Sequence, residues 1–286
     1  MFPSRRITTS GGDKFRDEYS LAFDGTNQYV AIDGLASTDV LTEDDGWAIG
    51  CWFKATQSDT NAAEEMIFSM NGIDSTNRPN IIRIGVNPNT TGDHVIGGIF
   101  FGDGRVDADQ TGAIVLTDSD DPDLGTSYTD GNWHHLVVTR ASEAGWQNAF
   151  CYVDGNLQGY AWNVTDGAAY NSGTFRSDPN WGSAELASFG QEWDNGPDAT
   201  DFFKGNISEA FVYNTTLTSS QVATIYNGRE PYNHKEGVAS GNLQAWYRMG
   251  DGLENNSGTT IYDMSDNSNN GTMTNMAADD FIGDTP

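Results

Sequence analysis

Short runs in which apolar and polar residues alternate recur along most of the chain. A period of two places alternate side chains on opposite faces of an extended segment, so each run predicts a β-strand with one buried face. The clearest runs cover residues 19–23, 28–32, 47–53, 65–70, 80–86, 94–101, 133–140, 149–153, 184–190 and 207–214. Turn residues separate them, and Asp154-Gly155 is a dipeptide that favours a tight hairpin turn. The pattern predicts an all-β fold, an antiparallel sandwich or barrel.

One segment departs from this period and predicts a short surface helix. Thr218 and Gln221 form a capping box, in which each side chain can bond to a backbone N–H group near the other residue. Val222 and Ile225 share one apolar face, and Gly228 is placed to end the helix. The helix follows directly after the strand predicted at residues 207–214.

The residues after this helix bear on domain organisation. An apolar run at 243–249 precedes a polar, turn-rich stretch at 261–275. Chains below about 40 to 60 residues are marginal without cross-links, so this tail is too short to bury a core of its own. We therefore assign residues 1–18 to an N-terminal arm and residues 19–286 to a single domain, with residues 240–275 as its closing strands.

The charge of the chain limits its partners. Its formal net charge is −27, from 41 acidic and 14 basic residues, which repels nucleic acid and anionic membrane surfaces. No run approaches the roughly 18 to 20 apolar residues that cross a bilayer. The first residues contain an arginine pair without a following apolar stretch, so no cleavable secretion signal is expected. We expect neither a nucleic-acid partner nor membrane insertion.

The two cysteines, Cys51 and Cys151, are too few for a disulfide framework. Both lie within apolar strand patterns, and neither has a second Cys or a His at zinc-like spacing. Packed thiols are the preferred interpretation. A single disulfide between them stays open as an alternative.

An acidic loop precedes the strand at 207–214 and is the main candidate for chemistry. Glu192, Asp194, Asp198 and Asp201 lie within ten residues of one another. Carboxylate oxygens at this density suit Ca²⁺, and alternate residues such as Glu192 and Asp194 can face one side of an extended segment. A solvated acidic loop is the alternative, but carboxylates this close repel one another without a cation.

Several of these segments, taken in their order along the chain, resemble a laminin-G-like jelly roll of the concanavalin A-like lectin/glucanase superfamily, with pentraxin-like details. The resemblance is carried by residues 19–32, 47–54, 130–140, 149–160, 189–194 and 202–228. The tail at 242–252 and 261–275 resembles the strand and turn that usually open such domains, but here it comes last. A circular permutation and the stump of a second repeat both fit that order.

The resemblance implies a set of calcium ligands. Pentraxins read Gly-Gln-Glu-Gln-Asp where this chain has Gly-Gln-Glu-Trp-Asp at 190–194, which implies Glu192, Asp194 and the main-chain carbonyl of Trp193 as ligands. The Phe-Lys-Gly at 203–205 matches the family motif that follows a further ligand, and this implies Asp201. The remaining family ligands align with Pro79-Asn80, where Asn80 alone supplies an oxygen. The resemblance therefore leaves open whether one or two calcium ions bind.

A catalytic interpretation of the same loop is less well supported. Laminarinase-type relatives in the superfamily use Glu-x-Asp-x-Glu or Glu-x-Asp-x-x-Glu, with the paired acids as nucleophile and acid/base. Glu192 and Asp194 begin this motif, but Gly196 and Pro197 stand where the second Glu belongs. We therefore expect no enzyme activity. Trp193 is the aromatic residue placed to contact a ligand, as a sugar platform beside the metal.

The sequence thus predicts a non-catalytic binding or assembly module with a Ca²⁺-organised rim for contact with glycans or with neighbouring subunits. Chains with this order of segments are similar to virion proteins of tailed phages and to marine surface proteins. The resemblance therefore implies a structural protein of a virion or an extracellular surface, acting as a homo-oligomer. A calcium-dependent lectin is the first alternative, and a glycoside hydrolase is the second.

Overall fold

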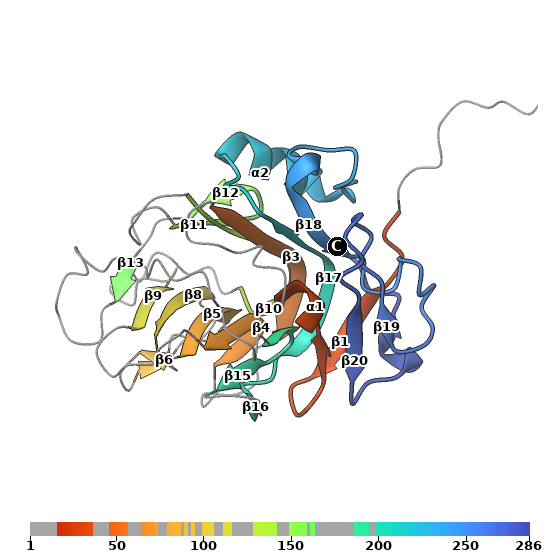
Figure 1. Cartoon of the computed structure of the whole chain (residues 1–286), viewed down its shortest axis with the longest axis horizontal. Coiled ribbons are helices and arrows are strands. Elements are labelled where there is room, and N and C mark those ends of the chain that lie inside the picture. Colours follow the sequence, from red (N-terminus) through yellow and green to blue (C-terminus); the bar gives the residue numbers. More distant parts are fainter. Residues whose placement is uncertain are drawn as a thin grey trace, which may run out of the picture.

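The computed structural model describes residues 16–36, 46–56, 64–73, 79–86, 89–90, 93–94, 99–105, 111–115, 128–141, 149–158, 161–163, 186–194 and 198–286. Within these ranges the chain forms two large sheets that pack face to face (Figure 1). The pairings between named strands are antiparallel in both sheets, as the period of two predicts. The all-β jelly-roll sandwich predicted from the sequence is confirmed.

The first sheet has eight strands. Its order is β12 (Asn156–Leu157), β11 (Ala149–Val153), β10 (Asp130–Arg140), β3 (Trp47–Thr56), β17 (Lys204–Tyr213), β1 (Ser20–Asp24) and β21 (Phe281–Ile282), with β18 (Leu243–Tyr247) also paired to β17. A bulge between Ser208 and Phe211 divides β17. The residues before the bulge pair with β1 and those after it pair with β18, so both chain-terminal regions join the same strand.

The second sheet has nine strands. Its order is β13 (Ala161–Asn163), β9 (Thr111–Val115), β8 (Ile99–Arg105), β5 (Pro79–Val86), β4 (Glu65–Ile73), β14 (Leu186–Phe189), β2 (Tyr29–Ala31), β20 (Gly271–Thr274) and β19 (Thr260–Ile261). Two small hairpins accompany it, β15 (Glu192–Asp194) with β16 (Asp198–Thr200) and β6 (Asn89–Thr90) with β7 (Asp93–His94).

The main core lies between the two sheets. Along β3, Ile49, Cys51 and Phe53 point into it, and they meet Phe68 of β4 and Ile84 of β5 from the other sheet. All five side chains are almost fully buried, so burial of apolar area holds the sheets together. Cys51 and Cys151 are both buried free thiols, as preferred from the sequence.

The helices are short, and among the described ones only the first contributes a side chain, Leu35, to the main core. They are α1 (Asp33–Ala36), α2 (Ser219–Tyr226) and the 3₁₀ turns η2 (Asn227–Arg229), η3 (Ser240–Asn242) and η4 (Ala278–Asp280). The capping box of Thr218 and Gln221 is formed as predicted. The α-helix ends at Tyr226 rather than continuing to Gly228, because Asn227 takes a left-handed conformation and a 3₁₀ turn follows. No helix among the described residues is long and apolar enough to span a membrane.

Helix α2 covers part of the outer face of the eight-stranded sheet. Its Val222 and Ile225 pack in a second cluster with Phe211, Tyr213 and Trp246. The helix and the β15–β16 hairpin lie at opposite ends of the molecule in the view of Figure 1. The two ends therefore present separate surfaces.

Candidate metal centre

The acidic loop connects β14 of one sheet with β17 of the other, so it lies at the rim of the sandwich. Backbone hydrogen bonds hold it against β4. The Gly190 N–H donates to the Ile67 carbonyl at 3.0 Å, and the Phe203 N–H donates to the Gly190 carbonyl at 3.0 Å. The Asp201 carbonyl accepts from the Met66 N–H at 2.9 Å. The loop is thus fixed at both ends to one strand.

Three carboxylates from separate parts of the chain converge at this rim. They belong to Glu64 immediately before β4, Glu192 of β15 and Asp201 after β16, and one oxygen of each lies within 4.8 Å of one oxygen of each of the others. Arg83 of β5 contributes the basic neighbour, with 3.2 Å between its Nη1 and the Glu192 Oε1. The centre therefore holds three acids and one guanidinium.

Glu192 is the most enclosed of the three, with 4% of its surface exposed. Burial is the main reason that its pKa rises, to about 7, against the lowering effect of Arg83. A hydrogen bond with Asp201 and the charges of Asp201 and Glu64 raise the pKa further. Without a bound cation, a proton on Glu192 relieves the repulsion among the three acids.

Backbone conformation and hydrogen bonds fix the segment between the metal cluster and the start of β17. Asp201 has a φ of 46°, in the left-handed region. The Lys204 N–H donates to Glu65 Oε2 at 3.0 Å, and burial raises the pKa of this glutamate. Gly205 has a φ of 154°, and a Cβ there would lie 2.2 Å from the Lys54 carbonyl oxygen. Only glycine fits that position, which fixes the start of β17.

The donor set of the centre fits a hard cation. Each of the three residues offers carboxylate oxygens and none offers sulfur or imidazole, a donor set that suits hard cations such as Ca²⁺, Mg²⁺ and Mn²⁺. Oxygens that share one Ca²⁺ at about 2.3 to 2.6 Å can lie at most about 5 Å apart. The observed limit of 4.8 Å satisfies this requirement before any rearrangement. A possible acidic metal-binding cluster is therefore present.

The structure brings together two of the predicted ligands, Glu192 and Asp201. The side chains of Asp194 and Asn80 lie outside what the structure describes, although their backbones belong to β15 and β5. Their roles, like that of the Trp193 carbonyl, stay predictions. Asp198 is exposed on β16 and is not a member of the described cluster.

Trp193 does not lie open beside the centre. Its side chain is 6% exposed, and its ring packs edge to face against Tyr29, with 5.4 Å between the ring centroids. Little of the indole is left for a sugar to stack on, so the expected platform has small exposed area here.

Glu64 and Arg83 are the members of the centre that sequence reasoning missed. A doublet of acids at 64 and 65 stands at the start of a predicted strand, and side chains of adjacent residues in a strand point to opposite sides. One of the two acids therefore has to face away from the other, and here Glu64 joins the centre whereas Glu65 binds the backbone of Lys204. This pair of adjacent acids was the sequence feature that could have indicated Glu64 as a member of the centre.

A sequence model described as the concanavalin A-like lectin/glucanases superfamily, of the laminin-G type, matches residues 24–223. No curated protein sequence matches the chain. The matched region contains Glu64, Glu192 and Asp201, and it excludes the C-terminal strands β18–β21.

Three solved structures that are similar to this chain share little sequence with it. A putative carbohydrate binding protein from Bacteroides ovatus is 13% identical over 95% of this chain and 60% of its own, with a TM-score of 0.57. A heptameric SAP-like pentraxin from Limulus polyphemus is 16% identical over 78% of this chain and 85% of its own, with a TM-score of 0.44. Tailspike protein 2 of Escherichia coli bacteriophage CAB120 is 14% identical over 84% of this chain and 31% of its own, with a TM-score of 0.45. The chain thus spans 60% of the length of the Bacteroides protein.

Proposed function

Because this chain belongs to the concanavalin A-like lectin/glucanase superfamily, we propose that it is a non-catalytic carbohydrate-binding module whose rim is organised by Ca²⁺. The observation that carries the proposal is the convergence of Glu64, Glu192 and Asp201 at the rim. The similarity in fold to a putative carbohydrate binding protein supports the choice of ligand class.

Calcium would act here by ordering the rim. When bound, it supplies a positive charge that three carboxylates can share, so that Glu192 is ionised without repulsion. Arg83 already offsets one of the negative charges. Because Glu64 and Asp201 are partly exposed, the ion would keep a side open to water or to sugar hydroxyl groups.

Glycoside hydrolysis is the second candidate, because folding brings a second carboxylate to Glu192 that its local sequence lacks. Retaining enzymes place their two carboxyl groups about 5 to 5.5 Å apart, on either side of the scissile bond. Here the pKa of Glu192 responds to a hydrogen bond with Asp201, and the Glu192 side chain is 5% exposed. A sugar would have to separate the two acids to reach between them, so the geometry favours binding over hydrolysis.

We also propose that the protein works as a homo-oligomer on a virion or an extracellular surface, in contact with glycans or with neighbouring subunits. Extracellular calcium sites commonly have dissociation constants of about 10⁻⁴ to 10⁻³ M. The positive charge of Arg83 beside the cluster opposes a bound cation, and a site weakened in this way needs the higher calcium concentrations found outside cells. Light scattering of the purified protein, and its recovery from purified particles or surface fractions, test this part.

The experiment for the main proposal is glycan-array binding, measured once in about 2 mM Ca²⁺, which is near the extracellular concentration, and once in EDTA. The wild type should bind a set of glycans with calcium and lose that binding in EDTA. Glu192→Gln should lack binding in both conditions, whereas Asp198→Asn, on the same hairpin but outside the cluster, should behave as the wild type. Glycan binding that is unchanged in EDTA and in Glu192→Gln would overturn the proposal. Release of reducing sugar would establish glycoside hydrolase activity instead.

A further inference from the structure

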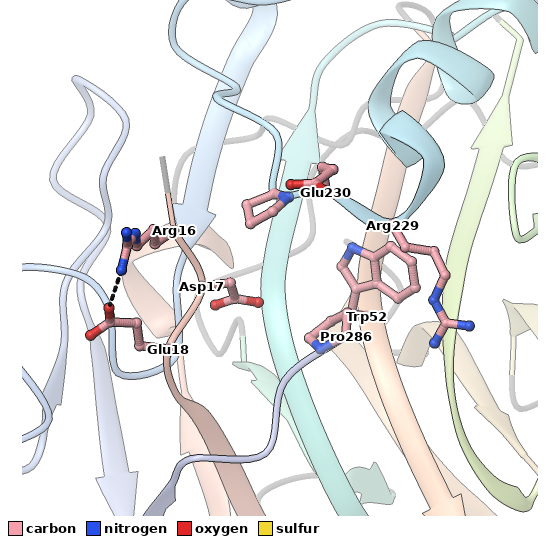
Figure 2. Close-up of a pocket in the computed structure, with 8 residues that line it drawn as sticks. Arg16, Asp17, Glu18, Trp52, Arg229, Glu230 and Pro286 are labelled. Atoms are coloured by element: carbon pink, nitrogen blue, oxygen red, sulfur yellow. Dashed lines mark ion pairs between the residues drawn. The ribbon is translucent and has the colours of Figure 1, made fainter. Parts of the chain in front are cut away.

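A pocket of about 360 Å³ lies on the outer face of the eight-stranded sheet, and it shares no residue with the metal cluster. Segments far apart in the sequence form its walls (Figure 2). The residues that matter for its chemistry are Asp17, Trp52, Arg229, Glu230, Pro231 and Pro286. Figure 2 shows the Asp17 carboxyl pointing from the N-terminal segment toward the space in front of β17, with Trp52 and Pro286 on the opposite side.

The apolar wall is rigid. Trp52 is 4% exposed and packs against the rings of His135 and Tyr226, with centroid distances of 5.0 and 5.6 Å. The Arg229 guanidinium carbon lies 6.0 Å from the centre of the indole, so the electron-rich face of this ring already attracts one cation. Little of the Trp52 indole is left exposed, so the accessible carbon surface of this wall belongs mainly to Pro231 and Pro286.

The opposite wall carries a carboxyl group that is short of positive charge. Ser208 donates to both Asp17 oxygens, at 3.2 and 3.0 Å. Asp251 and Glu209 are its acidic neighbours, and with burial as the main cause they raise the pKa of Asp17 to about 9. Arg248 is held by Glu209, with 2.8 Å between its Nε and Oε1. Three acids therefore surround one engaged guanidinium.

The charged groups at the mouth do not remove this imbalance. Arg16 and Glu18 form an exposed ion pair at 3.7 Å, and Arg229 and Glu230 add one charge of each sign to the lining of the pocket, so the charges at the mouth cancel. The whole chain is also strongly negative, at −27, so its field draws cations toward such a recess.

We propose that this pocket binds the ammonium group of a small aliphatic amine. The Asp17 and Glu230 carboxyl groups accept hydrogen bonds from the ammonium, and the carbon chain of the ligand lies against Pro231 and Pro286. Binding leaves Asp17 ionised, so its proton passes to solvent while the ammonium keeps its own three. The ligand thus replaces the proton as the positive partner of the buried carboxyl.

The test is calorimetric titration of the full chain at pH 7 with n-butylammonium chloride, and with n-butanol as the neutral probe of the same length. Butylammonium should bind and butanol should not. Asp17→Asn should weaken butylammonium by about tenfold or more, because a charged hydrogen bond is lost. Glu236→Gln, an exposed acid that does not line the pocket, serves as the matched control and should bind as the wild type does.

Two further readouts make the result decisive. In unbuffered sodium chloride the wild type should release close to one proton per butylammonium bound, and Asp17→Asn should release none. Nα-acetyl-lysine amide tests whether the amine can be presented by a protein side chain, and its binding would support the same chemistry from that source. Equal binding of butanol, or unchanged affinity in a folded Asp17→Asn, would overturn the proposal. EDTA should leave amine binding unaltered, which separates it from the metal site.

Discussion

Replacing Asp17 by Asn should stabilise the protein, and the gain should grow with pH. Asp17 has a pKa of about 9 in the folded chain against an ordinary value of 3.8, chiefly because it is buried beside other acids. Between these two values the folded state holds a proton that the unfolded state has lost. The contribution of neutral Asp17 is therefore fully present below about pH 3.8 and is lost as the pH rises toward 9.

The size of the effect follows from this linkage. Each pH unit within the window costs the wild type at most ~1.4 kcal/mol of unfolding free energy through this one group. Asparagine does not titrate, and its amide can still accept from Ser208 and donate to Asp251. For a chain of this size, ~1 kcal/mol shifts the melting temperature by about 2 to 4 °C, so the gap between variant and wild type should widen by up to about 3 to 5 °C per pH unit.

Thermal melts of both proteins at pH 5, 6, 7 and 8 measure this gap. Glu209, whose pKa burial raises to about 7, titrates in the same window, but it is present in both proteins. Because Glu209 is one of the acids that raise the pKa of Asp17, the gap reports the titration of Asp17 together with its effect on Glu209. A gap that stays constant over the four pH values would refute the reasoning, since it would mean that Asp17 is ionised in the folded protein throughout.

Three substitutions test other contacts. Arg83→Met should lower the melting temperature in EDTA, because Glu192 loses its counter-charge, yet tighten calcium binding by roughly fivefold as a repelling charge is removed; weaker binding in calorimetry would contradict this. Gly205→Ala should cost about 3 kcal/mol in urea unfolding, because its Cβ would collide with the Lys54 carbonyl, and a loss below about 1 kcal/mol would speak against that clash. Glu209→Ala should cost about 3 to 5 kcal/mol, because it removes the carboxylate that accepts from the Nε of the buried Arg248, and a near-neutral urea midpoint would show that water replaces that carboxylate.

The fold could be predicted because its signal is local. Alternation along β3 and β17 places one set of side chains of each strand in the core between the sheets, and the other set is buried as well in the cluster beneath α2. The helix at 219–226 was equally accessible, since its capping box and apolar face are both short-range features. Only its C-terminal end differed, where Asn227 rather than Gly228 takes the first left-handed conformation.

The candidate site was only partly accessible to the sequence. Glu192 and Asp201 are close along the chain and share a loop, so their approach could be inferred. Glu64 and Arg83 reach the centre through the pairing of β4 with β5 and β14, which no local pattern specifies. Asp17 likewise meets its partners only through contacts between distant segments, because Ser208 belongs to β17 and Asp251 lies beyond β18.

Calcium titration followed by thermal melting tests the central claim most directly. With calcium at about 100 times its dissociation constant, binding adds ~2.7 kcal/mol to the folded state, which corresponds to a rise of about 5 to 10 °C in the melting temperature. We predict this rise for the wild type and for Asp198→Asn, its reversal by EDTA, and its absence in Glu192→Gln. A wild-type melt that is the same in calcium and in EDTA would contradict the account.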